Sequence, residues 1–139
     1  MKYKYIIGID PGVNTGLAIW DKEFKKLTKV DTFKIHNAMD LIKDIAFTTL
    51  GNILVRLEDA RLRTWFGNAG REQLQGAGSI KRDAKIWEDF LTDKAIPFEL
   101  VAPKNNKTKV KADYFKQLTG WQGQTNEHSR DAAMLVFGL

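Results

Sequence analysis

Hydrophobic and polar positions follow two distinct patterns along the chain. Short runs rich in β-branched and aromatic residues are typical of strands, and they predict strands at 6–9, 17–20, 27–33, 53–58 and 98–101. Apolar residues spaced three and four apart are typical of amphipathic helices, and they predict helices at 38–50, 71–93, 112–119 and 126–139. Because only short polar turns separate the first three strands, we expect them to form an antiparallel meander.

The predicted helices carry signals at their ends. Asn37 is the expected N-cap of the first helix and Gly51 its expected stop. Thr125 or Asn126 is expected to cap the last helix, which from Ala132 onward is nearly all apolar and must be buried. In the long helix the apolar residues form one stripe: Leu74, Ala77, Ile80, Ala84, Trp87 and Leu91.

The composition is that of one domain with a hydrophobic core, since 43% of the 139 residues are hydrophobic. Cysteine is absent, which excludes disulfide and thiolate chemistry. No apolar run is long enough to span a membrane and no signal peptide is recognisable, so we expect a cytoplasmic protein. The formal net charge of +5 favours a polyanionic partner.

Asp10 stands at the end of the first apolar strand, directly after Ile9. A carboxylate buried there is costly unless something offsets its charge, and a metal ion is the usual solution. Gly12 and Gly16 in the following turn would let a metal or phosphate approach the backbone. The alternative is that Asp10-Pro11-Gly12 is only a hairpin turn.

This strand–Asp–turn–strand opening occurs in two functional classes. One comprises the RNase H-like nucleases, where the Asp binds metal, and the other comprises the actin-like and sugar-kinase-like ATPases, where the turn binds nucleotide phosphate. The ATPases place their cleft between two related domains, whereas this chain has room for one and shows no second Asp-x-Gly turn. The nuclease class is therefore favoured.

Glu58 repeats the pattern, because it follows the apolar strand that begins at Ile53. If the two strands lie side by side, Glu58 and Asp10 come together, whereas Asp59 alternates to the other face. His128 and Asp131 are three residues apart at the start of the last helix, so they share a face. Such oxygen ligands suit Mg²⁺ or Mn²⁺, and a histidine is compatible with either ion.

Two segments have the composition of a nucleic-acid contact. The first combines arginines with adjacent aromatics, which suits phosphate contact and base stacking: Arg61, Arg63, Trp65, Phe66 and Arg71. An equal alternative is that its two aromatic residues close over the core. The second is a basic loop without acids, which is either a phosphate-binding edge or solvated surface: Lys104, Lys107, Lys109 and Lys111.

In this order, the motifs resemble those of the RuvC-type Holliday junction resolvases of the RNase H-like superfamily. The resemblance covers nearly the whole chain. It is carried by Ile7-Gly8-Ile9-Asp10-Pro11-Gly12 with Gly16, Glu58 after its strand, Gln75-Gly76-Ala77-Gly78, the lysine-rich loop after Pro103, and His128-x-x-Asp131-Ala132-Ala133.

The resemblance implies a fold, a site and an activity. The fold is α/β, with an RNase H-like mixed five-stranded sheet (the antiparallel meander plus two parallel strands) flanked by helices. The four metal-binding catalytic positions match Asp10, Glu58, His128 and Asp131. The family carries either Asp or His at the position of His128. The implied activity is resolution of Holliday junctions or other branched DNA with two Mg²⁺ or Mn²⁺ ions, by a homodimer.

Two features depart from the family pattern. Trp65 and Phe66 come later after Glu58 than the family's aromatic wedge residue does. The chain also ends soon after the last helix, as expected for a compact form from a phage or mobile element in a bacterial cell. Two alternatives remain open: a nuclease for flaps, forks or structured RNA, and a non-catalytic RNase H-like domain that binds nucleic acid. The complete set of acids favours the enzyme.

Overall fold

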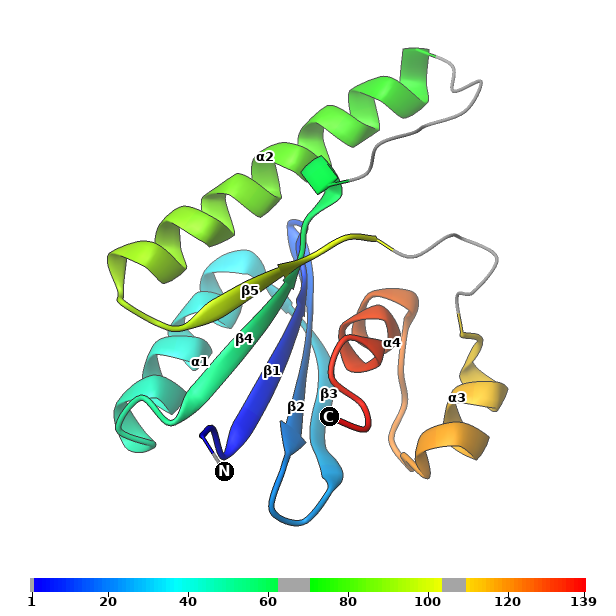
Figure 1. The fold of residues 1–139 in the computed structure, drawn as a ribbon. Coiled ribbons are helices and arrows are strands. Elements are labelled where there is room, and N and C mark those ends of the chain that lie inside the picture. The colour runs from blue at the N-terminus through cyan, green and yellow to red at the C-terminus, as the bar shows by residue number, and fades with distance from the viewer. Residues whose placement is uncertain (1, 63–70, 104–109) are drawn as a thin grey trace.

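One mixed sheet organises the protein. The computed structural model describes residues 2–62, 71–103 and 110–139, with side chains in the long helix from residue 78 onward. The strands are β1 (Tyr5–Asp10), β2 (Asn14–Asp21), β3 (Lys26–Lys34), β4 (Ile53–Glu58) and β5 (Phe98–Val101), in the order β3-β2-β1-β4-β5 (Figure 1). β2 pairs antiparallel with β1 and β3, whereas β4 pairs parallel with β1 and β5. The predicted meander with two added parallel strands is confirmed.

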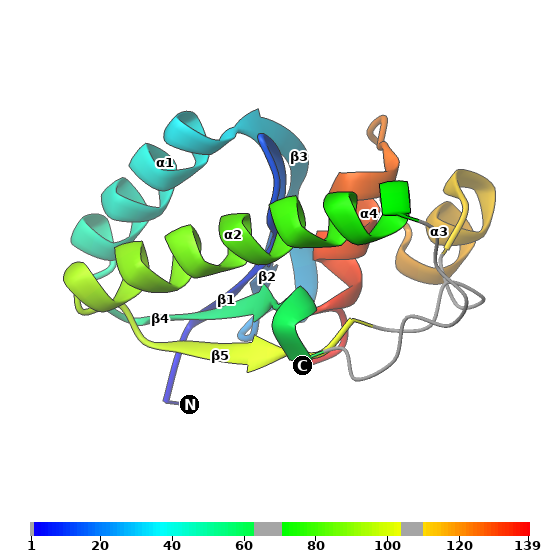
Figure 2. The ribbon, with the colours of Figure 1, turned by 90° about the horizontal axis from the view of Figure 1, so that it is seen from above.

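Helices cover both faces of this sheet. The helices are α1 (Ile35–Thr48), α2 (Arg71–Asp93), α3 (Ala112–Thr119) and α4 (Glu127–Met134), with a 3₁₀ turn η1 (Ala60–Leu62) after β4. α1 and α2 lie on one side, and α4 lies on the other with α3 beyond it (Figures 1 and 2). In the described ranges, no helix combines the length and apolar character needed to cross a membrane.

Alternation along each strand creates a separate core on each face. In β1, Ile7 and Ile9 face α1 and α2, where they join a cluster that contains Trp87. Ile6 points the other way and joins the cluster that contains Ala132 and its neighbours on α4. Residues 6, 8 and 10 therefore share the α4 face, while residues 7 and 9 share the face of α1 and α2.

The first helix begins earlier than its sequence signals predict. α1 starts at Ile35, and its N-cap is Lys34, whose side chain makes no capping hydrogen bond. The prediction of Asn37 as the cap is wrong, because β3 runs directly into the helix. The Ile35 N–H instead donates to the Val13 carbonyl at 3.0 Å, so part of the capping requirement is met from the β1–β2 turn. The helix does end before Gly51, which adopts a φ of +78°.

The long helix matches its predicted range but only part of its predicted apolar stripe is buried. Ala84, Trp87 and Leu91 are fully buried, whereas Ile80 is 48% exposed. The reason is geometric, since the N-terminal half of α2 projects beyond the edge of the sheet (Figure 1). The side chains of Leu74 and Ala77 lie outside the described residues.

The last helix is shorter than predicted. α4 ends at Met134, and residues 135–138 form turns closed by bonds such as the one from the Leu135 N–H to the Ala132 carbonyl at 3.2 Å. Gly138 adopts a φ of +85°, which stops any further helix. The predicted burial is confirmed at Val136, which is fully buried, but not at Leu139, which is 50% exposed.

Candidate active site

The candidate site lies where β1 ends beneath the first turn of α4. The Asp10 side chain is 13% exposed, and its Oδ2 lies 3.2 Å from Nδ1 of His128. His128 donates in this hydrogen bond, because an ionised carboxylate can only accept. The His128 side chain is 52% exposed. The structure thus brings together two of the predicted site residues, one largely shielded and one open to solvent.

Two glycines allow α4 to come this close to the sheet. Gly16 is the ladder partner of Asp10 in β2. A Cβ atom on Gly16 would overlap the carbonyl oxygen of His128, and one on Gly8 would overlap that of Ala132. The backbone of α4 therefore rests directly on β1 and β2. The interpretation of Gly16 as an approach route for metal or phosphate is wrong, because α4 occupies that space.

The cap of α4 fixes its N-terminal turn over the sheet. The Asn126 side chain accepts a hydrogen bond from the Ser129 N–H at 2.9 Å, and the Asn126 N–H donates to Ser129 Oγ at 3.0 Å. This capping box confirms the predicted role of Asn126. The Thr32 hydroxyl on β3 also donates to Asn126 Oδ1 at 2.8 Å, which ties the cap to the sheet.

Glu58 ends the strand beside β1. The parallel register pairs Ile9 with Leu57, so its continuation by one residue places Glu58 beside Asp10. Both side chains lie on the α4 face, as shown by Arg56, whose Nε donates to the Leu135 carbonyl at 2.8 Å. Asp59 is buried on the opposite face, as the sequence predicts. Asp131 is half-buried on α4, one turn after His128.

The four predicted ligands share one region without forming a closed cage. Among the residues that the structure describes, no three Asp, Glu, His or Cys side chains are close enough together to hold a metal ion. Mg²⁺ commonly takes only one or two protein carboxylates and completes its shell with water and substrate phosphate. The chemistry of the donor set therefore fits Mg²⁺ or Mn²⁺ best as ions that bind together with a phosphate substrate.

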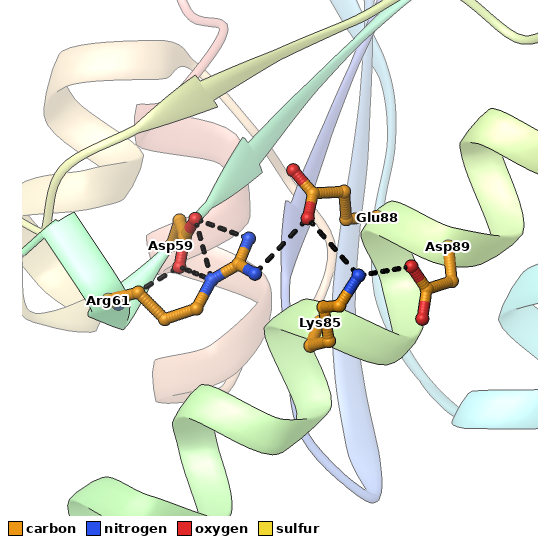
Figure 3. A network of polar contacts seen from close by, with 5 residues as sticks. All are labelled: Asp59, Arg61, Lys85, Glu88 and Asp89. Carbon is orange, nitrogen blue, oxygen red and sulfur yellow. Dashed lines mark hydrogen bonds and ion pairs between the residues drawn. The ribbon is translucent and has the colours of Figure 1, made fainter.

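Arg61, which the sequence predicts as a phosphate contact, is held in ion pairs with two acids of its own chain. Its guanidinium donates to the Asp59 carboxylate at 2.7 Å and to Glu88 at 3.1 Å, on the face of α2 (Figure 3). Burial alone would raise the pKa of Asp59, but the hydrogen bonds from Arg61 outweigh it, and the pKa lies below its usual value. Hydrogen bonding to Asp59 likewise holds the pKa of Arg61 above its usual value.

Most of the other predicted nucleic-acid contacts cannot be placed. Lys111 is exposed at the N-terminus of α3. The remaining residues lie outside the described residues, or have side chains that do: Arg63, Trp65, Phe66, Arg71, Lys104, Lys107 and Lys109.

Two arginines that connect the elements around the site were not predicted from the sequence. Arg56 links β4 both to the end of α4 and to Glu99 on β5, at 2.7 Å. Arg130 on α4 donates to the Val110 carbonyl at 2.9 Å, just before α3. The available signal for Arg56 was a cation inside an apolar strand, on the face that carries Glu58.

One of three comparisons with known proteins bears on the fold. No protein-family model matches the chain, and no curated protein sequence matches it. Among solved structures, T. thermophilus RuvC in complex with a Holliday junction substrate is similar, with a TM-score of 0.58 and 15% sequence identity. The match covers 94% of this chain and 89% of that one. At this identity the likeness shows the fold alone, so the chain has the RNase H-like fold that RuvC also has.

Proposed function

We propose that this protein is a divalent-metal-dependent endonuclease that resolves Holliday junctions or other branched DNA by symmetric phosphodiester cleavage. The observation that carries the proposal is the contact of Asp10 with His128 at the end of β1, next to Glu58. The RuvC-like fold supports it, since that fold is shared with a protein solved on a Holliday junction.

Each candidate residue has a role that follows from its position. Asp10 is shielded and rigidly placed, so its carboxylate would hold a metal ion with little freedom to move. Glu58 would add a second carboxylate from the neighbouring strand, and Asp131 a third from α4. His128 is half-exposed, so its imidazole can reach both Asp10 and a bound phosphate. Two bound Mg²⁺ or Mn²⁺ ions would activate water and stabilise the leaving oxygen.

The proposed DNA surface combines Lys111 with basic and aromatic residues that lie outside the described residues. The net charge of +5 favours a polyanion. Lys111 is exposed on α3, which lies beside α4 in both views of the fold (Figures 1 and 2). Lys104, Lys107, Lys109, Arg63 and Arg71 are proposed to contact phosphates, with Trp65 and Phe66 stacking on bases.

We propose that the protein acts as a homodimer, because two symmetric nicks in a four-way junction require two sites related by a two-fold axis. The projecting half of α2 offers a surface for a second copy. In this half Gly78 has open space around it and Ile80 is 48% exposed, and Ile86 in the other half is 41% exposed. Trp87 belongs to the core and Phe90 packs against it, so neither is available to a partner. Sedimentation with and without junction DNA tests this; a monomer that still makes paired nicks would contradict it.

Cleavage is tested by incubating the protein with a synthetic four-way junction, a fork, a flap and a linear duplex, with and without Mg²⁺. We expect Mg²⁺-dependent cutting of the junction. Asp10→Asn should lower the rate about a thousandfold, since several kcal/mol of transition-state stabilisation are lost. It should leave the fold and DNA binding intact, because the side-chain shape is kept. Cutting at the wild-type rate by Asp10→Asn would refute the assignment.

A second candidate function is a non-catalytic domain that binds branched nucleic acid. The lack of three convergent ligands among the described residues favours it. The same substrates separate the two candidates, because this domain would bind the junction and cut none of the four. Cutting of only the fork, the flap or a structured RNA would instead assign a nuclease with a different substrate geometry.

A further inference from the structure

Asp59, the residue after Glu58, has a buried carboxylate, and both of its oxygens accept hydrogen bonds. The Asp59 side chain is 1% exposed and faces α2, opposite to Glu58. Arg61 donates to it from Nε at 2.8 Å, from Nη2 at 2.7 Å and from its backbone N–H at 2.9 Å. A two-pronged contact of this kind is the strong form of an ion pair, and it fixes orientation as well as charge.

Arg61 also reaches the long helix. Its Nη1 donates to Glu88 Oε1 at 3.1 Å, and Lys85 Nζ lies 3.9 Å from that same oxygen (Figure 3). Lys85 in turn pairs with Asp89 at 2.6 Å on the exposed side of α2. The chain Asp59–Arg61–Glu88 therefore connects the end of β4 to the C-terminal half of α2, and we call it the β4–α2 latch.

The backbone around Asp59 is held in the same place. The Asp59 N–H donates to the Val101 carbonyl of β5 at 2.8 Å, and the Asp59 carbonyl accepts from the Leu62 N–H at 3.0 Å. The latch thus acts on a residue whose main chain and side chain are both fixed. Glu58 precedes it by one residue, so its backbone position is set by the same contacts.

A phosphate contact would require Arg61 to leave this arrangement. Removing it would leave the buried Asp59 charge without its partner, which is strongly unfavourable. We therefore propose that Asp59 and Arg61 are positioning residues, which act through Glu58 by fixing the exit of β4 against α2, and that Arg61 is not a DNA contact. The proposal rests on the function proposed above, because Glu58 is its candidate ligand.

The first test compares Arg61→Lys with Arg61→Gln. Lys keeps the charge but cannot reproduce the planar fork. If Arg61 positions Glu58, both variants should lose about 10- to 100-fold in kcat with KM unchanged, and both should need more Mg²⁺ for half-maximal cleavage. If Arg61 contacts phosphate, Arg61→Lys should behave as wild type, which would overturn the proposal.

The second test uses Glu88→Gln, with Asp89→Asn as a matched control. Both changes remove one negative charge from neighbouring positions on α2, but Glu88 pairs with Arg61 whereas Asp89 pairs with Lys85. Glu88→Gln should lower kcat and raise the Mg²⁺ requirement, and Asp89→Asn should do neither. Equal effects of the two changes would overturn the latch. Rates are compared at a temperature below the unfolding midpoint of each variant, so that lost stability is not counted as lost catalysis.

The third test needs no cleavage and separates the two proposals. In the Asp10→Asn background, binding to the four-way junction is measured against salt. A positioning residue predicts that Arg61→Gln leaves the slope of log K against log salt unchanged, whereas a phosphate contact predicts a slope smaller by about one unit. A smaller slope overturns the latch even if the enzyme cuts junctions. If the wild-type protein cuts none of the substrates, the proposed enzymatic function is refuted. An unchanged slope would still exclude Arg61 from the DNA surface in that case.

Discussion

The two faces of the sheet use the same strands for opposite purposes. On the side of α1 and α2, β1 presents Ile7 and Ile9, and these pack against large buried side chains of the two helices. On the side of α4, the same strand presents Ile6, which joins the second core, and then Gly8 and Asp10, one without a side chain and one charged. The alternation in β1 therefore gives one face that is purely a hydrophobic core and a second face that combines a core with the candidate chemistry.

The acids at the end of β4 show the same division. Glu58 lies on the α4 face, and Asp59 lies on the opposite face with its charge matched by Arg61. A buried carboxylate that is fully paired has no capacity left for a metal ion or substrate, so it serves the fold. Acids adjacent in sequence can therefore have different roles, decided by the face to which each one points.

The largest effect on stability is expected on the α1/α2 face. Ile7→Ala should lower the free energy of unfolding by about 2–5 kcal/mol, because Ile7 is fully buried and its loss leaves a cavity. Urea denaturation measures this, with Leu50→Ala as control. Leu50 is 94% exposed, so its truncation should change stability by less than about 0.5 kcal/mol. Equal losses of stability in Ile7→Ala and Leu50→Ala would mean that this face is not the main core.

The α4 face should instead respond in activity. His128→Ala should slow junction cleavage about 100-fold or more, because the side chain that contacts Asp10 is lost. Stability should change little, since half of this side chain is exposed. His128→Asp should keep Mg²⁺-dependent cleavage, because Asp is an oxygen ligand that suits the same ion. The other histidine, His36, is exposed on α1, and His36→Ala should cut at the wild-type rate.

Much of the fold could be predicted from the sequence because alternation and helical spacing are local signals. The ranges of β4, β5, α2 and α3 agree with prediction. Ile80 was placed in the core because its spacing fits the stripe, but whether a helix residue meets the sheet depends on where the sheet ends. The end of α4 was missed because the buried segment after Met134 keeps the same apolar composition without the helical hydrogen bonds.

The candidate site could be predicted only in part, because most of it depends on tertiary contacts. Asp10 and His128 were found as separate motifs 118 residues apart in the chain, and only the fold shows them in contact. The sequence predicts Arg61 as a DNA contact, and it gives no sign of the ion pair with Glu88, which lies on another element, 27 residues away. A charge whose partner is distant in sequence cannot be distinguished from an exposed one by composition alone.

Packing of α4 on the sheet is tested by two glycine substitutions that should change the free energy of unfolding in opposite directions, each by a smaller amount. Gly8→Ala should lower the free energy of unfolding by about 1–3 kcal/mol, because the new Cβ would overlap the Ala132 carbonyl and force α4 away. Gly78→Ala is the matched control, since Gly78 lies within α2 with open space around it. There the same change should raise stability by about 0.5–1 kcal/mol through helix propensity. A neutral Gly8→Ala would show that α4 does not rest on β1.

The smallest expected effect compares two asparagines near helix starts. Asn126 accepts from the Ser129 N–H at 2.9 Å, whereas Asn37 lies in the first turn of α1 and is not its cap. Asn126→Ala should therefore lower the free energy of unfolding by about 0.5–2 kcal/mol, and Asn37→Ala should leave it nearly unchanged. Asn126→Ser should restore most of the loss, because Ser is also a good N-cap.

Urea denaturation of the three variants measures these differences, and junction cleavage by the same samples shows whether the cap also matters for the site. His128 lies two residues after Asn126, so a frayed first turn would misplace its imidazole relative to Asp10. We therefore expect Asn126→Ala to lose cleavage as well as stability, and Asn37→Ala to lose neither. If Asn37→Ala proved as costly as Asn126→Ala, the start of α1 would have to be stabilised by a cap at Asn37 after all.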